Sequence, residues 1–392
     1  MWGIFITFVG MKYFMIAGEA SGDIHGSQLI EAIKKHDQEA QFCFLGGDLM
    51  AQAAGRAPLI HYRDMAFMGF VEVMKHLGSI LGFMKRAKQA ILEFAPHAVV
   101  LIDYPSFNLK MAKFAKAHGV PVFYFISPKV WAWKEWRVAR IKRYVTRVYS
   151  ILPFEVEFYR RHHYEVDYVG NPTVKEIAQA SEQFGTFGDF ASRNGLDPSR
   201  PLIALVPGSR RKEIADNLPV MVEAATQFSH YQLAIAGAPG IDASLYGTVL
   251  APLGVEVTIV RGQSFELVHH ARVALVTSGT ATLEAAILQT PQVACYRMNG
   301  SKWLYRFYRR LLHGNYVTLP NLIADEAIIP ELLLHHCTSE SIGKWLSDLL
   351  PSSPRRTAML DGYHRVAERL TQKDCTDATA RNIIAYLNEQ QN

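Results

Sequence analysis

The chain has 392 residues, of which 49% are hydrophobic and 20% are charged. This length favours two domains over one, and this composition excludes a disordered or low-complexity protein. The net charge is only +5, and the four cysteines include no C-x-x-C pair, which indicates reduced thiols in a cytoplasmic protein rather than a disulfide scaffold.

The first ten residues are apolar and lack a basic n-region, so they resemble a signal peptide or a membrane anchor in hydropathy alone. Lys12 interrupts the run, and residues 13–17 are predicted to form the first core strand, which leaves a segment too short to span a bilayer. We therefore expect the chain to start at Met11 rather than at Met1.

Short, almost continuously apolar segments alternate with helical patterns, which predicts parallel sheets covered by helices on both faces. Strands are expected at 13–17, 41–45, 98–102, 122–126, 148–152 and 167–169, and then at 202–206, 233–236, 255–261 and 273–276. After Pro330 only helices are expected, and Asn171-Pro172 is typical of an interdomain turn. We expect one domain over 11–172, a second over 173–345, and C-terminal helices over 346–392 that pack back on the first domain.

Acidic side chains follow two strands of the first half. Glu19 follows the first strand, and Asp103 follows the strand at 98–102. Ligands of open parallel sheets bind beyond the carboxyl ends of the strands, so both carboxylates are expected to line an interdomain cleft. Burial there raises the pKa of a carboxyl, which suits Asp103 for a general base; the alternative is an aspartate that caps a helix. The spacing of Asp23 and His25 is the only one that would suit two ligands of a metal ion. We nevertheless expect no metal there.

One methionine-rich apolar stretch, 65–84, and two aromatic and basic segments predict contact with lipid. A core helix is the alternative for the apolar stretch, and RNA binding is the alternative for the basic segments. We rank an anionic membrane surface first, and expect no nucleic-acid partner, because an apolar stretch has no use in RNA binding. The arginines of the first basic segment are spaced for one helix face. The residues concerned are Met68, Phe70, Val71, Trp131, Trp133, Trp136, Arg137, Arg140, Arg143, Arg147, Trp303 and Arg306.

A phosphate-binding turn is predicted where the strand at 202–206 ends. Pro207-Gly208-Ser209-Arg210 follows it, and a helix opens near Glu213. Unpaired N–H groups and the dipole of a helix start attract phosphate, and arginine adds a fork of donors. The alternative is an ordinary turn with a surface arginine.

A second turn of the same kind follows the strand at 273–276. Ser278, Gly279 and Thr280 can cap the next helix and bind phosphate, and Glu284 lies one helical turn further on, where it can accept hydrogen bonds from ribose hydroxyls. The alternative for Glu284 is a carboxylate that complements the helix dipole. Gly237 ends another strand in a tight turn. Two such turns favour a nucleotide diphosphate, whereas the absence of G-x-G-x-x-G and P-loop motifs argues against NAD enzymes and P-loop ATPases.

Nine short runs, in order, make the chain similar to the lipid-A-disaccharide synthase family, which has the GT-B fold of two Rossmann-like domains facing a cleft. They are AGEASGD at 17–23, MGFVEV at 68–73, IDYP at 102–105 with Phe107-Asn108, SPKVWAW at 127–133, LPFE at 152–155, PGSR at 207–210 with Glu213, SGTATLE at 278–284, YRM at 296–298 and YVTLPNL at 316–322.

The resemblance implies transfer of 2,3-diacylglucosamine from its UDP derivative to 2,3-diacylglucosamine 1-phosphate, with inversion and without a cofactor or metal. It implies that Asp103 is the base, that Glu19 orders the cleft, and that the first domain holds the acceptor. It places UDP on the second domain, at Gly208, Ser209, Arg210, Glu213, Gly237, Ser278, Gly279, Thr280 and Glu284. It also implies a peripheral position on the cytoplasmic face of the inner membrane, and it leaves a homodimer open.

The chain departs from the family pattern at Ser106, where many relatives have a second acid, at Asn171, where histidine is frequent, and at the more basic Arg211-Lys212. The loss of a like charge beside Asp103 lowers its expected pKa. Two other kinds of protein stay open at this point. One is another GT-B enzyme, such as a peptidoglycan precursor transferase or a UDP-sugar 2-epimerase, and the other is a membrane-bound nucleotide-binding protein without catalysis.

Overall fold

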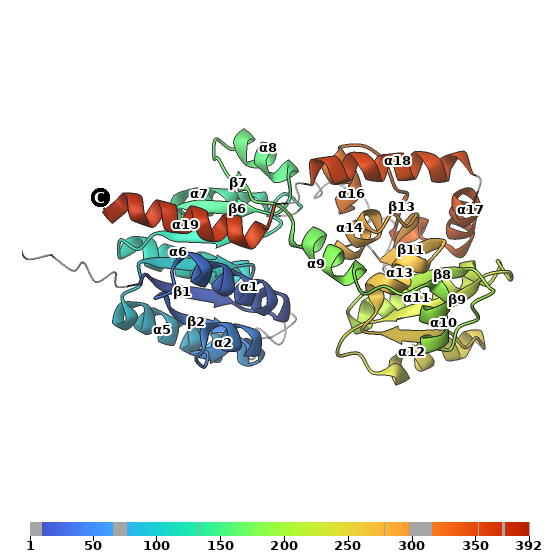
Figure 1. The fold of residues 1–392 in the computed structure, drawn as a ribbon, viewed down its shortest axis with the longest axis horizontal. Coiled ribbons are helices and arrows are strands. Elements are labelled where there is room, and N and C mark those ends of the chain that lie inside the picture. The colour runs from blue at the N-terminus through green and yellow to red at the C-terminus, as the bar shows by residue number, and fades with distance from the viewer. Residues whose placement is uncertain are drawn as a thin grey trace, which may run out of the picture. The chain divides into compact units, whose positions relative to one another are not determined.

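The computed structural model describes residues 10–65, 77–132, 134–277, 279–297, 316–351, 353–370 and 373–391. These residues form two compact units (Figure 1). Unit 1 contains the chain up to Pro172 together with the C-terminal segment from Gln372, and unit 2 contains Thr173–Thr371. Among the described residues, no helix combines the length and the hydropathy that crossing a bilayer requires.

Unit 1 is built around a parallel sheet in the order β3-β2-β1-β4-β5-β6-β7. Its strands are β1 (Lys12–Ala17), β2 (Gln41–Gly46), β3 (Ile60–His61), β4 (Ala98–Ile102), β5 (Val122–Phe125), β6 (Arg147–Ser150) and β7 (Asp167–Tyr168). Its helices are α1 (Ala20–His36), α2 (Asp48–Ala54), α3 (Tyr62–Met65), α5 (Leu77–Phe94), α6 (Pro105–Ala117), η1 (Glu135–Arg137), α7 (Val138–Tyr144), α8 (Phe154–Arg161) and α19 (Cys375–Gln391).

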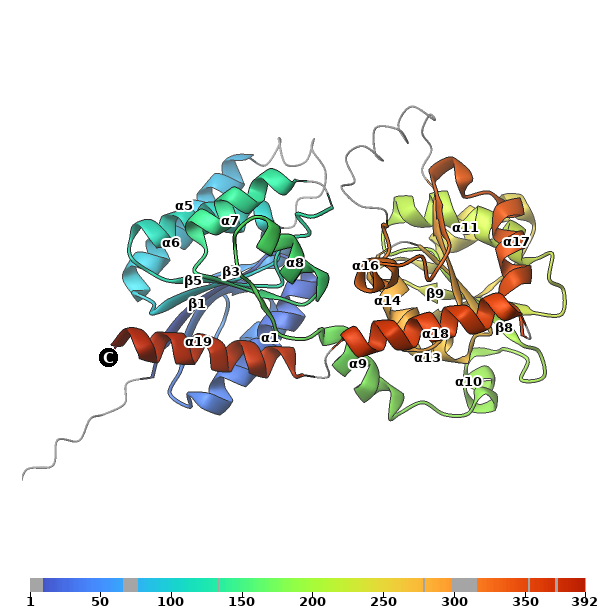
Figure 2. The same cartoon turned by 90° about the horizontal axis from the view of Figure 1, so that it is seen from above.

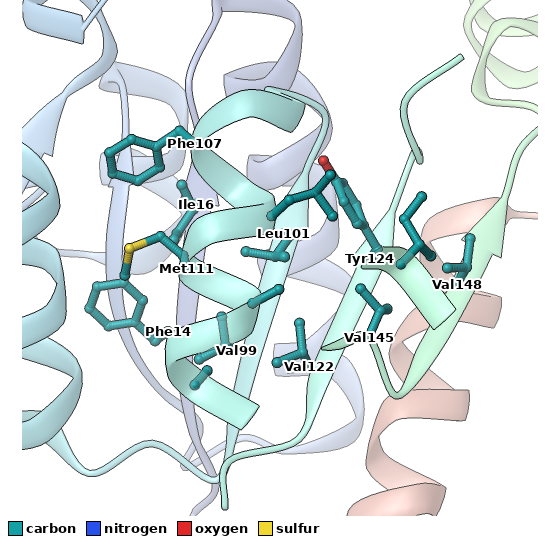
Figure 3. Packing of buried hydrophobic residues seen from close by; sticks show 14 of the residues in the cluster. Phe14, Ile16, Val99, Leu101, Phe107, Met111, Val122, Tyr124, Val145 and Val148 are labelled. Carbon is teal, nitrogen blue, oxygen red and sulfur yellow. The ribbon is translucent and has the colours of Figure 1, made fainter. Parts of the chain in front are cut away.

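Helices cover both faces of this sheet, as expected for strands that are apolar on both sides. On one face, side chains of β1, β4 and β5 pack against Phe107 and Met111 of α6 (Figure 3). On the other face, α1 and α19 lie side by side (Figures 1 and 2). Cys375, Ala380, Ile383 and Leu387 of α19 join the buried cluster there.

Unit 2 is built around a second parallel sheet, in the order β10-β9-β8-β11-β12-β13. Its strands are β8 (Leu202–Val206), β9 (Gln232–Gly237), β10 (Thr258–Arg261), β11 (Val273–Thr277), β12 (Gln292–Tyr296) and β13 (Glu331–Leu333). Its helices are α9 (Pro172–Ser181), α10 (Phe187–Asn194), α11 (Arg211–Ala225), α12 (Ala243–Leu250), η2 (Ala251–Leu253), α13 (Ser264–His270), α14 (Thr280–Ile287), α16 (Leu319–Ala324), η3 (Leu334–His336), α17 (Ser339–Leu349) and α18 (Pro354–Arg369). Helix α18 lies against α14 and α16 (Figure 2).

The structure differs from the sequence predictions at several places. Strands β3 and β12 were not expected. Only α19 packs on unit 1, whereas α17 and α18 belong to unit 2, because Ile342, Leu346 and Met359 are buried there. The segment after Pro330 is not wholly helical, since it forms β13. Arg147 opens β6 and bonds to Asp167 at 3.6 Å, so it does not share the face of α7 with Arg140.

Both sheets change direction at one pair of adjacent strands. Starting from β1, the chain adds β2 and β3 on one side and then crosses to β4 on the other side; in unit 2 the same change separates β8 from β11. A crevice opens beyond the carboxyl ends of such a pair, and it is where open α/β sheets bind their ligands. The topology therefore indicates one candidate site in each unit.

Candidate active site

Glu19 and Asp103 lie on neighbouring turns at the carboxyl ends of β1 and β4. Strands β1 and β4 pair so that Ala17 lies opposite Ile102, which makes the turns after both strands neighbours. The ring of Tyr104 packs over Gly18, where a Cβ would come within 2.3 Å of the ring. Glu19 is exposed at the start of α1, and its charge adds to burial in raising the pKa of Tyr104. The structure therefore brings together the two carboxylates that the sequence indicated.

The backbone at Asp103 adopts an unfavourable conformation. Asp103 and Tyr104 have φ angles of 44° and 46°, in the left-handed region, which costs about 1–2 kcal/mol per residue. Two buried side chains hold the turn, because Tyr124 Oη and Asn108 Nδ2 each donate to the Asp103 carbonyl oxygen at 2.6 Å. Backbone strain of this kind is concentrated at functional sites.

The environment of the Asp103 carboxyl suits a general base. Burial raises its pKa, whereas a backbone hydrogen bond and the charge of Lys129 act in the opposite direction. Lys129 comes from the loop after β5, the strand next to β4. A carboxyl that is partly desolvated but still ionisable can accept a proton near neutral pH.

The loop that carries Lys129 is anchored by a buried glutamate. Trp131 Nε1 donates to Glu155 Oε1 at 3.0 Å, and the hydroxyl of Ser150 also donates to Glu155. Glu155 is 2% exposed, and burial raises its pKa to about 7. Trp131 is half-buried and packs edge-on against Phe154, so less of it is free for lipid than its sequence position suggested.

The exposed aromatic residue of this region is Trp136, which is 59% exposed. The guanidinium groups of Arg137 and Arg140 lie 5.6 and 5.1 Å from its ring centroid. The other residues that we expected to contact lipid, together with one expected UDP ligand, lie outside the described residues. They are Met68, Phe70, Val71, Trp133, Trp303 and Arg306, and Ser278.

The two predicted phosphate turns lie side by side in unit 2. Strands β8 and β11 pair with Val206 opposite Val276, so the turn at 207–210 and the turn before α14 share the crevice. Gly208 has a φ of 109°, and a Cβ there would come within 2.7 Å of the Glu213 carboxylate. Only glycine fits this position without strain.

Glu213, a predicted member of the UDP site, is bonded to the turn itself. It accepts hydrogen bonds from the backbone N–H groups of Ser209 and Arg210 at 3.2 and 3.3 Å, and from the Arg210 guanidinium at 3.2 Å. A carboxylate has no proton to donate to a phosphate, so Glu213 shapes the turn and does not itself bind UDP phosphates. The Arg210 side chain is 69% exposed, so its guanidinium is accessible from solvent although it pairs with Glu213.

The second turn carries the predicted ribose partner. Gly279 precedes α14 with a φ of 150°, Thr280 is exposed, and the Thr282 hydroxyl donates to the Gly279 carbonyl oxygen at 2.8 Å. Burial, with a contribution from Glu176, raises the pKa of Glu284 to about 7. The glycine at the start of α14 and the raised pKa of Glu284 both agree with a turn that binds a ligand.

Packing within the sheet explains the glycine at position 237. A Cβ at this position would come within 2.9 Å of Ile259 Cγ2 on the neighbouring strand β10. Its small size is therefore required by the sheet, independently of any ligand.

Sequence reasoning missed the residues that hold the Asp103 turn and the loop of Lys129. Asn108, Lys129 and Glu155 stand in the recognised runs but had no predicted role, and Tyr124 stands in none of them. Within the described part of the chain, no three His, Cys, Asp or Glu side chains are grouped to hold a metal ion.

Comparison with known proteins identifies the family. The family model for lipid-A-disaccharide synthetase matches residues 13–384. The chain is 37% identical to the lipid-A-disaccharide synthase of Acidobacterium capsulatum over 373 residues, which cover 91% of each chain. It is 35% identical to the lipid-A-disaccharide synthase of Koribacter versatilis over 385 residues, which cover 96% of this chain and 98% of the relative.

Among solved structures, the fold is similar to that of the UDP-GlcNAc 2-epimerase from Neisseria meningitidis bound to UDP-GlcNAc. The TM-score is 0.65 at 11% identity, over 96% of this chain and 100% of the other. At that identity the likeness shows the fold alone, which is the pair of Rossmann-like sheets expected for GT-B. The family match over nearly the whole length is more specific, and by it the chain belongs to the lipid-A-disaccharide synthase family of glycosyltransferases.

Proposed function

We propose that this protein transfers 2,3-diacylglucosamine from UDP-2,3-diacylglucosamine to the 6-hydroxyl of 2,3-diacylglucosamine 1-phosphate. The products are the β-1,6-linked disaccharide 1-phosphate and UDP. Membership of the family supports this reaction. The observation that carries it within the molecule is the Asp103 turn, which presents a partly desolvated carboxylate at the crevice of unit 1.

Asp103 takes the proton from the acceptor hydroxyl as the hydroxyl oxygen attacks the anomeric carbon of the donor. The bond between that carbon and the UDP oxygen breaks in the same step, which inverts the anomeric configuration. Glu19 orders the acceptor in this proposal, and its position at the neighbouring turn supports that role. Tyr124 and Asn108 act through the backbone of Asp103 and are positioning residues.

Unit 2 binds the UDP part of the donor. Arg210 is exposed beside the turn at 207–210, and the N–H groups at the start of α14 lie at the adjacent turn. Donors fixed before the reaction stabilise the negative charge that develops on the departing UDP without reorganisation. Glu284 accepts hydrogen bonds from the ribose hydroxyls.

Contact with a membrane surface is a further part of the proposal, because both proposed substrates are lipids. A shallow groove between α5 and α6 is lined by Leu81, Met84, Lys85, Lys88, Gln89, Leu92 and Phe114. Leu81 and Leu92 are 52% and 49% exposed, and lysines beside such apolar side chains suit anionic headgroups. The purified protein is expected to float with anionic liposomes at low salt and to be released as salt increases. Failure to float at low salt would contradict this part.

The deciding experiment combines the purified protein with both diacyl substrates and identifies the products by mass spectrometry. We expect the mass of the tetra-acyl disaccharide 1-phosphate and an equal amount of UDP. Conversion of UDP-N-acetylglucosamine without any lipid would instead reveal an epimerase. Binding of UDP without product would reveal a protein that lacks catalysis.

A further inference from the structure

Three basic side chains are gathered around the Asp103 turn. Lys129 follows β5, Lys134 precedes the short helix η1, and Arg137 is the last residue of η1. All three come from the segment between β5 and α7, which is adjacent to Asp103 because β5 pairs with β4. Phosphate binding commonly uses such groups of lysine and arginine.

Arg137 is attached to the same turn as the base. Its Nη2 donates to Ser106 Oγ at 3.2 Å, and Ser106 is three residues beyond Asp103. Its charge also acts on the Tyr124 hydroxyl, which donates to the Asp103 carbonyl oxygen. The guanidinium therefore lies at the crevice of unit 1 rather than on a remote surface.

Two of these side chains are partly desolvated beside another positive charge. Burial lowers the pKa of Arg137 and that of Lys134, and in each case a neighbouring arginine lowers it further. Within the described ranges, Arg137 forms no ion pair with a carboxylate, and Glu135 beside it pairs with His162 at 2.9 Å. Partly desolvated like charges destabilise one another, and an anion bound among them removes that cost.

We propose that Arg137, with Lys129 and Lys134, binds the phosphomonoester of the acceptor sugar. This inference rests on the proposed function, because the acceptor has to place its hydroxyl at Asp103 and carries its phosphate on the same sugar ring. A phosphomonoester has two negative charges and oxygens that a guanidinium contacts in pairs. Arg140, which lies over the exposed ring of Trp136, is not part of this phosphate site and is assigned to contact with the membrane surface.

The experiment compares two acceptors, 2,3-diacylglucosamine with and without the 1-phosphate, in neutral detergent micelles. For the wild type, kcat/KM is expected to fall about 10- to 100-fold when the phosphate is absent, as for lost hydrogen bonds to a charged group. Arg137→Met is expected to cause a similar loss with the phosphorylated acceptor and little change with the other. Arg137→Lys keeps the charge and is expected to recover part of the loss.

Lys116→Met is the matched control, because Lys116 is an exposed cation in the last turn of α6, at the opposite end of that helix from Ser106. It is expected to behave as the wild type with both acceptors. The KM for the UDP-sugar is expected to stay unchanged in all variants, and thermal melting checks that each is folded.

Four outcomes would overturn the inference. If the wild type used both acceptors equally, the inference would be wrong and the proposed function would stand. If neither acceptor gave a product, the proposed function itself would be wrong. An equal loss with both acceptors in Arg137→Met would show that Arg137 only supports the Asp103 turn through Ser106. A loss seen with anionic vesicles but not in neutral micelles would assign Arg137 to bilayer headgroups.

Discussion

Replacing Glu155 with glutamine is expected to remove a pH dependence of folding stability. Glu155 is 2% exposed, and its carboxyl accepts hydrogen bonds from Trp131 Nε1 and the Ser150 hydroxyl. Burial raises its pKa to about 7 from an ordinary value of 4.5. Glutamine has nearly the same shape and keeps an acceptor oxygen, but it cannot ionise.

The magnitude follows from linkage between protonation and folding. At 1.36 kcal/mol per pH unit, the raised pKa corresponds to roughly 3 kcal/mol in the free energy of unfolding. The folded state holds this proton more tightly than the unfolded chain does. The stabilising contribution is therefore fully present below pH 4.5 and is lost as the pH rises through about 7.

The effect is measured by urea denaturation at about pH 5 and at about pH 8.5. Hydrogen exchange of peptides from β5 and β6 follows the unfolding of unit 1. Glu155→Gln is expected to match the wild type at the lower pH and to exceed its stability by roughly 3 kcal/mol at the higher pH. Glu157→Gln, a change at a 61% exposed side chain of the same helix, is expected to follow the wild type. An equal difference between Glu155→Gln and the wild type at both pH values would refute the reasoning.

Three further predictions concern the two crevices. Asp103→Ala is expected to lower kcat by about 10²- to 10⁴-fold, as for loss of a general base, while calorimetry shows UDP binding unchanged; retained activity would exclude Asp103 as the base. Arg210→Ala is expected to weaken UDP binding by about 1–3 kcal/mol in the same calorimetric titration, because a charge-assisted contact is lost, and an unchanged affinity would place the diphosphate elsewhere. Tyr124→Phe removes one of the two donors to the Asp103 carbonyl oxygen, so we expect a loss of about 1 kcal/mol in urea denaturation together with a lower kcat. An undiminished kcat in this variant would show that the turn does not need Tyr124.

The sequence predicted the sheets and the turns at their ends because buried parallel strands are continuous apolar runs. The expected strand at 98–102 is β4, and the expected strand at 202–206 is β8. The strands that it missed are β3, β12 and β13. Strands β3 and β13 have only two and three residues, which is too short to show any period, whereas β12 has five residues and its apolar run was overlooked. Arg147 was placed on a helix because its spacing suits one, although pairing of β6 with β5 and β7 decides its conformation.

The surroundings of Asp103 could not be predicted in the same way. Tyr124, Lys129 and Glu155 reach the Asp103 region because β4, β5 and β6 are neighbours in the sheet. A pattern along the chain gives the strands but not which of them are adjacent. Glu213 illustrates a second limit, since the sequence indicated a place in the UDP site but not the bonds that Glu213 accepts from Ser209 and Arg210.

The two crevices have the same topology, and the proposed reaction gives each of them a different task. Asp103 is the proposed base, and its burial raises its pKa, whereas the nearby charge of Lys129 offsets only part of that rise. In the proposed reaction, Arg210 and the start of α14 supply the donors and the positive charge that a departing diphosphate needs. The proposed acceptor also carries a phosphate, so the crevice of Asp103 needs positive charge as well. An anion that pairs with those positive side chains offsets their effect on the base, which can then keep a raised pKa.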